Sequence, residues 1–117
     1  MSAQTDLVAR LKADPGVTAL IGTRVYPFPA PVNADLPLIV YSLVIGVYEN
    51  ILDGGSSHVA NRVQINCWDN SYKTVQDLAD AVEAAVDGYG YIQLRSDDYD
   101  DEVNEHRVIL DWSRITP

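Results

Sequence analysis

The chain changes its hydrophobic period once, near residue 70, and this change restricts the folds open to it. Over residues 61–68, apolar side chains alternate with polar ones, as in a strand buried on one face. Over residues 72–86, apolar side chains recur every three or four positions, as along one side of a helix. Because the connection is so short, we expect the helix to fold back over the apolar strand face, which carries Val63, Ile65 and Cys67.

Residues suited to capping mark both ends of this helix. Asn70 and Ser71 carry side-chain oxygens that can accept hydrogen bonds from the free N–H groups of a first turn, so the helix is expected to begin at one of them. Gly88 can adopt the left-handed conformation that ends a helix. We therefore predict one long helix over about residues 71–87. Its buried stripe would consist of Tyr72, Val75, Leu78, Ala79, Val82, Ala85 and Val86.

Shorter elements are expected on both sides of this strand and helix. Two short helices are predicted near the N-terminus, the second capped by Asp14 and begun by Pro15. They span residues 5–12 and 15–21. Further strands are predicted at about residues 24–26, 38–48, 89–95 and 106–115, with Gly90 weakening the third of these.

Three connecting segments are predicted to be loops or turns from their composition. Residues 27–37 hold four of the six prolines and predict a stiff extended loop. Residues 49–58 contain a Gly-Gly pair and predict the turn of a hairpin. Residues 96–105 are strongly acidic and predict a solvated turn.

This order of elements predicts an α+β fold. Hairpin connections outnumber crossovers, so we expect a mostly antiparallel sheet with the long helix and the short N-terminal helices packed on one face. At 117 residues the chain is expected to form a single domain, 1–117. The other face of the sheet would then carry Trp68, several tyrosines and polar groups, and would need either water or a partner.

The charge of the chain argues against two classes of partner. Eight Lys and Arg residues against seventeen Asp and Glu residues give a net charge of −9 and an isoelectric point near 4.3. The cations are scattered, so sequence-specific nucleic-acid binding and adsorption to an anionic membrane are both disfavoured. No apolar run approaches the roughly 20 residues needed to span a bilayer.

No residue pattern points to catalysis, a metal or a cofactor. The only histidines, His58 and His106, have no second ligand at a metal-binding spacing. The acidic run over residues 98–102 alternates like the start of a calcium loop, but the required Gly and the Glu at the twelfth position are missing. The lone Cys67 lies on an apolar strand face and is expected to be a small buried hydrophobic residue. We therefore predict no catalytic, cofactor-binding or metal site, and no enzyme activity.

Two of the predicted loops keep apolar side chains that have little obvious core to enter. Such side chains either bury themselves in a neighbouring molecule or fold over their own sheet. The same two possibilities apply to the tryptophan on the uncovered sheet face. Together these side chains form a candidate interface of Phe28, Val32, Ile51, Leu52 and Trp68.

Several short segments occur in an order that is similar to a known family. They include Asp14-Pro15 before a short helix, then GTRVYP over residues 22–27, then Leu36-Pro37. RVQI over residues 62–65 follows, leading to Tyr72 and to LADAV over residues 78–82. In this order, over nearly the whole chain, they resemble the small tail-completion proteins of long-tailed phages and prophages.

The resemblance implies an α+β subunit similar to tail terminators, which join head and tail and assemble as a ring, commonly of six. Such a ring caps the head-proximal end of the tail tube and offers a docking face to the head. The implied partners are other copies of this chain, the tail-tube protein and the head connector protein. The implied location is the tail or neck of the virion, reached after assembly in the cytoplasm of a bacterial host. The family has no catalytic residues to carry over.

The acidic composition suits a ring through which DNA passes. Six copies would carry 6 × (−9) = −54 charges. A negative lumen would repel DNA phosphates, so that DNA would slide through without specific binding.

Other interpretations stay open from the sequence. A tail-tube or neck subunit of similar architecture would have the same pattern of elements. A small homodimeric ligand-binding or regulatory α+β domain is an alternative of another class, and an enzyme is a third and more distant one.

Overall fold

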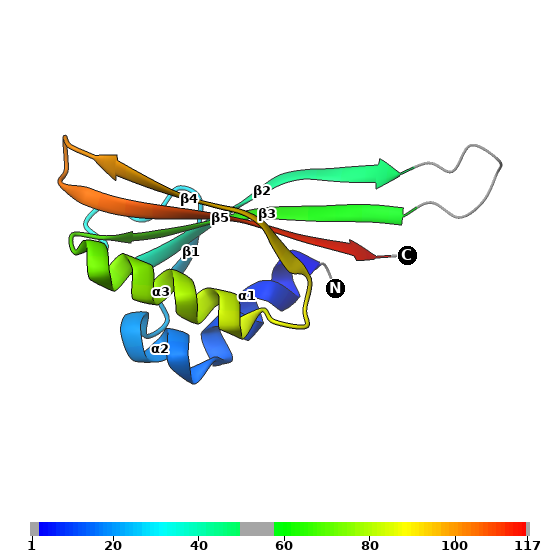
Figure 1. Cartoon of the computed structure of the whole chain (residues 1–117), viewed down its shortest axis with the longest axis horizontal. Helices are drawn as coiled ribbons and strands as arrows, with labels where there is room; N and C mark the ends of the chain where they lie inside the picture. Colours follow the sequence, from blue (N-terminus) through cyan, green and yellow to red (C-terminus); the bar gives the residue numbers. More distant parts are fainter. Residues whose placement is uncertain (1–2, 50–57, 117) are drawn as a thin grey trace.

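The described part of the chain folds into one sheet, with its helices on one side. The computed structural model describes residues 3–49 and 58–116. Five strands form a mixed sheet in the order β1-β2-β3-β5-β4, and three helices cover one of its faces (Figure 1). The elements are α1 (Ala3–Ala13), α2 (Pro15–Ile21), β1 (Val25–Pro27), β2 (Leu38–Glu49), β3 (His58–Asp69), α3 (Tyr72–Ala85), β4 (Tyr91–Asp100) and β5 (Glu105–Thr116).

The sheet is antiparallel except at its first pair. β2 with β3, β3 with β5, and β4 with β5 are antiparallel pairs, whereas β1 pairs with β2 in parallel. The parallel pair needs a long connection, because the chain must return along the strand before it can run in the same direction again. Residues 28–37 supply that return. The prediction of an α+β fold with a mostly antiparallel sheet is confirmed.

The central hairpin joins β2 to β3. Its register runs from Leu38 opposite Trp68 to Glu49 opposite His58, with one shift between Leu43 and Ile45. The predicted hairpin is therefore present. The predicted interface residues Ile51 and Leu52 lie outside the described residues.

Helix α3 begins at one of the two predicted caps. Ser71 is the N-cap, and its side chain accepts a hydrogen bond from the Thr74 N–H at 3.3 Å. The helix ends at Ala85, and Gly88 follows with φ +79°. At 14 residues α3 is only moderately longer than α1, at 11 residues, so the expected dominance of one long helix is not borne out clearly.

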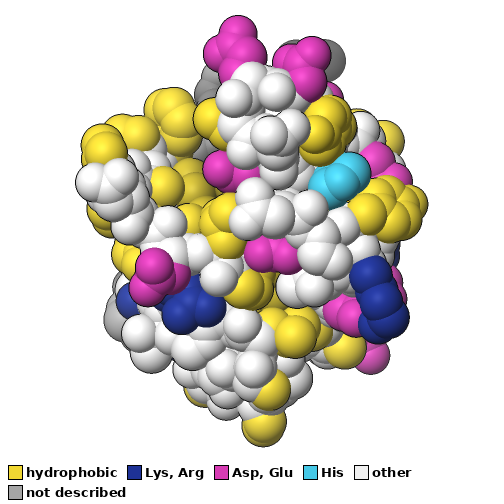
Figure 2. Space-filling view, turned by 90° about the vertical axis from the view of Figure 1, so that its left-hand side faces the viewer, with side chains coloured by type: hydrophobic (Ala, Val, Ile, Leu, Met, Phe, Trp, Pro, Cys, Tyr) yellow, Lys and Arg dark blue, Asp and Glu magenta, His cyan; other side chains and the backbone are white. Residues whose placement is uncertain are grey.

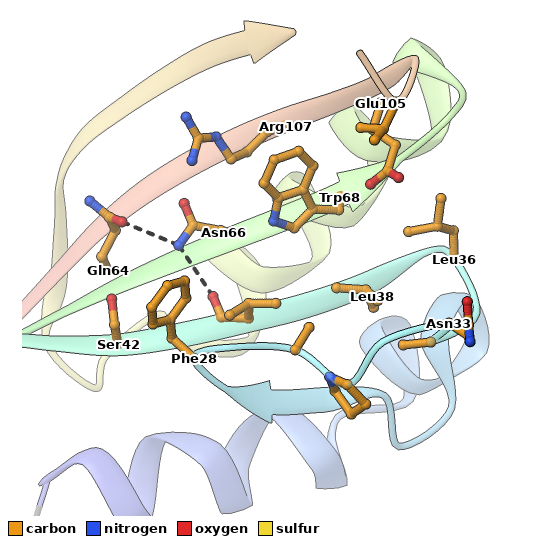
Figure 3. A pocket seen from close by; sticks show the side chains of 15 residues that line it. Phe28, Asn33, Leu36, Leu38, Ser42, Gln64, Asn66, Trp68, Glu105 and Arg107 are labelled. Atoms are coloured by element: carbon orange, nitrogen blue, oxygen red, sulfur yellow. Dashed lines mark hydrogen bonds between the residues drawn. The ribbon is translucent and has the colours of Figure 1, made fainter. Parts of the chain in front are cut away.

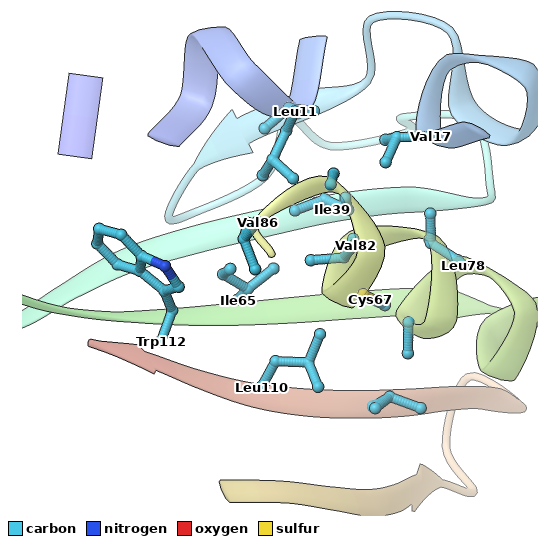
Figure 4. Close-up of a cluster of buried hydrophobic side chains, with 14 of the residues drawn as sticks. Leu11, Val17, Ile39, Ile65, Cys67, Leu78, Val82, Val86, Leu110 and Trp112 are labelled. Carbon is cyan, nitrogen blue, oxygen red and sulfur yellow. The ribbon is translucent and has the colours of Figure 1, made fainter. Parts of the chain in front are cut away.

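The stripe of α3 packs on the predicted strand face. Ile65 and Cys67 lie beneath it (Figure 4), and all three residues of this face, Val63 included, are completely buried. Burial raises the pKa of the Cys67 thiol to about 12, because the thiolate would lose its hydration, so this side chain is a neutral core residue. Neighbouring strands and the other helices complete the core with Leu7, Leu11, Val17, Ile21, Ile39, Val108, Leu110 and Trp112.

Tyr72 is the one member of the predicted stripe that the core does not contain. Its side chain is 55% exposed. The ring meets His106 edge to face, with centroids 5.5 Å apart, and the hydroxyl donates to Asp97 at 3.4 Å. A phenol at the first helical turn can lie along the surface and keep its polar end in water, which explains why periodicity alone placed it wrongly.

Strand β4 is longer than predicted. The acidic segment expected as a turn over residues 96–105 continues as strand to Asp100, and only residues 101–104 form the turn. Its carboxylates are matched to partners: Arg107 on β5 donates to Asp98, and Gln76 on α3 donates to Asp97 at 3.0 Å. Since these charges are compensated, a strand can hold them.

Gly90 precedes β4 and does not interrupt it. Its φ is +88°, and a Cβ at this position would lie 2.6 Å from the Ser113 carbonyl oxygen. Glycine therefore allows the chain leaving α3 to pass close against β5 before β4 begins.

Arg95 on β4 binds the outer face of α3. Its guanidinium donates to Asp80 at 2.8 Å, to Glu83, and to the Gln76 side-chain oxygen at 2.7 Å. Two carboxylates of α3, Asp80 and Glu83, therefore bind the edge strand to the helix.

Leu110→Ala tests the position of the core. Leu110 is completely buried, so the truncation should lower the free energy of unfolding by about 2–5 kcal/mol. Leu94→Ala on β4 is the matched control, since Leu94 is 59% exposed and should cost less than about 0.5 kcal/mol. Urea unfolding followed by circular dichroism measures both values, and equal losses would contradict the described packing.

Candidate assembly site

Along every central strand, side chains point alternately into the core and onto the sheet face opposite the helices, called here the open face. It carries Val40 on β2, Asn66 and Trp68 on β3, and Arg107 on β5. Its charges are largely compensated within the chain. Arg62 pairs with Asp111 at 2.6 Å, and Arg107 pairs with Asp98.

A groove of about 700 Å³ lies on the open face. The loop over residues 28–37 forms one side of it, and Val103 in the β4–β5 turn contributes to the other. Leu38 and Trp68 lie between these two sides (Figure 3), and Val40 also lines the groove. Two hydrogen bonds hold this loop in position. The Phe28 N–H donates to the Tyr41 carbonyl at 2.9 Å, and Arg24 Nε donates to the Pro37 carbonyl at 2.9 Å.

The groove contains polar atoms without hydrogen-bond partners among the described residues. Asn66 is only 6% exposed, and its Nδ2 donates to the Val40 carbonyl at 3.4 Å and to the Gln64 side-chain oxygen at 3.2 Å. These two acceptors leave Asn66 Oδ1 on the side of Arg107, where it has no donor (Figure 3). Arg107 Nε is likewise unpaired, while the guanidinium lies 5.0 Å from the centre of the Trp68 ring. Buried polar atoms left without partners cost free energy.

One end of the groove is acidic. Glu105 lines it, and the turn that contributes Val103 also carries Asp101 and Glu102. Burial, followed by the charges of Asp100 and Asp69, raises the pKa of the Glu105 carboxyl. Figure 2 faces this end of the molecule and shows acidic side chains spread among apolar ones.

The predicted interface residues fall into three groups. Phe28 and Trp68 both line the groove, with Phe28 73% exposed and Trp68 half-buried. Val32 belongs to the same loop and is 89% exposed. Ile51 and Leu52 are outside the described residues, as noted above. The role of all five in an interface stays a prediction.

The sequence analysis missed the other half of the groove. Val103, 51% exposed, is an apolar residue within an acidic run, and that contrast was the available signal. Asn66 and Arg107 gave no signal, because polar residues are expected on a solvated strand face.

Both edges of the sheet have free backbone. β1 pairs only with Ile39, Val40 and Tyr41 of β2, so the second half of β2 has no outer neighbour among the described strands. β4 forms the opposite edge along its whole length. Apolar side chains remain exposed beside these edges, with Leu43 at 50%, Tyr91 at 49% and Leu94 at 59%.

The described residues contain neither a metal-binding cluster nor a membrane-spanning helix. Over residues 3–49 and 58–116, no group of three or more His, Cys, Asp or Glu side chains is arranged to hold a metal ion. Within the same ranges, no helix has both the length and the hydrophobicity that a membrane span requires.

Glu105→Gln tests the electrostatics of the acidic end. Because the folded pKa of Glu105 is raised, the folded state binds its proton more tightly, and stability is lost as the pH rises through that pKa. The amide should therefore raise Tm slightly at pH 7, by up to about 3 °C, and this gain should vanish below the unfolded pKa of about 4.3. Thermal unfolding at pH 7 and at pH 3.5 measures the difference, and an unchanged or lower Tm at pH 7 would contradict a raised pKa of Glu105 in the folded state.

Comparisons with known proteins identify a family and a shared fold. Residues 5–116 match the family described as "Tail completion protein gp17". A solved chain from the "Virion of native gene transfer agent (GTA) particle" has the same fold, with a TM-score of 0.70 and 19% sequence identity. The alignment covers 93% of this chain and 90% of that chain. A comparison with functionally curated proteins gave no match.

Proposed function

The chain belongs to the tail completion protein gp17 family, and from this premise we propose that it caps the tail tube as a ring of copies, as a tail terminator or head–tail joining component. Membership in the family makes it a structural protein of the virion tail. The proposal adds how it acts, namely by adhesion among copies and to neighbouring proteins.

The observation that carries the ring proposal is the pair of free sheet edges. β2 is antiparallel to β3, β3 to β5, and β5 to β4, so β2 and β4 run in opposite directions. In a ring the copies share one orientation, so β4 of one copy would meet the free half of β2 in the next as an antiparallel pair. The contact uses two different surfaces, as closed rings require. It would also cover edges that are otherwise prone to uncontrolled pairing.

The proposed partners beyond further copies are the tail-tube protein and the head connector protein. A cap must bind the tube at one end of the ring and the connector at the other, and we propose six copies to match the usual ring of this kind. The chain would assemble in the bacterial host cytoplasm and remain in the tail or neck of the virion.

DNA would pass through the ring without specific binding. Both arginines described on the open face, Arg62 and Arg107, are paired with carboxylates of their own chain. If this face lines the channel, it presents neither of these cations freely to phosphates. The remaining acidic charge would repel DNA wherever it faces the lumen.

Capping of tail tubes tests the proposal directly. Purified protein mixed with tubes of the same virion should add density to one end only, and tubes polymerised in its presence should stop growing. Electron microscopy of negatively stained tubes measures both effects, with bovine serum albumin as the inert control. Binding along the tube wall would instead indicate a tube or neck subunit, and tubes left unchanged would contradict capping.

Ile51→Asp combined with Leu52→Asp tests whether these two predicted interface residues take part in assembly. We expect the double variant to fold normally and to lose assembly, because two charges would enter an apolar contact between molecules. Analytical ultracentrifugation measures assembly, and thermal unfolding measures the fold. A loss of stability as large as that of Leu110→Ala would show that these side chains serve their own core instead.

A further inference from the structure

We propose that the groove on the open face binds an extended segment of a different virion protein, one that presents apolar side chains together with Lys or Arg. This inference rests on the proposed function and names the chemistry of one of its contacts. A second copy of this chain and DNA are the competing occupants.

The shape and lining of the groove fit a polypeptide segment. Its floor is formed by Leu38, Val40 and Trp68, and exposed apolar side chains stand on both sides, Phe28 on one and Val103 on the other. An apolar side chain entering between them would remove these exposed rings and methyl groups from water, which is the main favourable term in association.

Unpaired polar atoms at the floor point to a ligand that has both a donor and an acceptor. Within residues 3–49 and 58–116, Asn66 Oδ1 is a buried acceptor without a donor, and Arg107 Nε is a buried donor without an acceptor. Both residues line the groove. A peptide group supplies one N–H and one C=O, so a backbone amide or an Asn or Gln side chain could satisfy both once the flexible Arg107 side chain shifts. A purely apolar occupant would leave both unpaired.

Charge selects the partner. Glu105 lines the groove, and Asp100, Asp101 and Glu102 adjoin it in the strand end and the turn. DNA is therefore repelled at this end, whereas a cationic segment would relieve the mutual repulsion of the carboxylates.

A second copy cannot readily supply that cationic segment. Four of the eight Lys and Arg residues pair with carboxylates of their own chain, namely Arg62, Lys73, Arg95 and Arg107. Arg24 binds the Pro37 carbonyl, and Arg10 and Arg114 lie 4.7 and 4.1 Å from the centre of the Tyr89 ring. In the described part of the chain, Lys12 alone makes none of these contacts. Another copy has a net charge of −9, so it would bring further negative charge to the acidic end of the groove.

A pair of charge-matched double variants tests the proposal. Glu102→Lys with Glu105→Lys reverses charge at the groove. Asp77→Lys with Asp87→Lys makes the same change in net charge at exposed positions on α3 and just after its end. Phe28→Ser removes one apolar side of the groove without changing charge. Thermal unfolding of each variant checks that it folds. The probes are purified tail tubes and purified head connectors of the same virion, each tested alone by cosedimentation.

We expect the wild type to bind at least one probe, and the groove double variant to bind that probe about tenfold or more weakly at 0.1 M salt. The α3 double variant should stay within about threefold of the wild type. The difference in binding between the wild type and the groove double variant should become smaller at 1 M salt. The Debye length is about 3 Å there, compared with about 10 Å at 0.1 M salt. Phe28→Ser should weaken binding at both salt concentrations.

Three results would overturn the inference. Equal binding by the groove variants and the α3 variant would show that the groove does not contact the partner. Loss of self-association by the groove variants, with normal binding to tubes and connectors, would assign the groove to a second copy. Wild-type protein that binds neither probe would contradict the proposed function, and the inference would fall with it.

Discussion

Packing of α3 against the face of β3 that carries Val63, Ile65 and Cys67 is the interaction on which the rest of the structure depends. It gives the sheet a single buried face, with β2 and β5 extending that face on either side and α1 and α2 completing the cover. No second helical layer is described for the opposite face. The sheet therefore contributes stability through one side and remains available for contacts through the other, together with its two edges.

Charges in this chain are arranged so that local pairs cancel while one end stays acidic. Arg95 connects β4 to α3 through Asp80 and Glu83, and Arg62 is paired on the open face. Exposed pairs of this kind add little stability. These pairs instead affect specificity, because they leave few cations for contacts between molecules. Carboxylates without a cationic partner among the described residues then remain near the β4–β5 turn. A subunit arranged in this way discriminates between partners by charge as well as by shape.

The elements that periodicity and capping residues determine locally were predictable from the sequence. Asp14 caps α2 and Ser71 caps α3, as their side-chain oxygens indicated. The extent of β4 was not predictable, since the partners that compensate Asp97 and Asp98 come from α3 and β5, far away in the sequence. For the groove, Phe28 and Trp68 were identified as apolar residues without an evident core, but Asn66 and Val103 join them only through the register of the sheet and the position of the turn.

The hairpin of β2 and β3 extends past the ends of the helices (Figure 1). Its far half pairs with the end of β5, and this three-stranded ribbon has no described helix on either face. Leu43 is on the helix side of the sheet and is still half exposed, which shows where the cover ends. Backbone amides in such a ribbon are protected by hydrogen bonds alone, without a packed layer above them, and open at low free energy. Deuterium uptake along this ribbon would therefore be fast in the free subunit and slow once neighbouring subunits cover it. The exchange rate of these amides would then show whether a subunit has been incorporated into a particle.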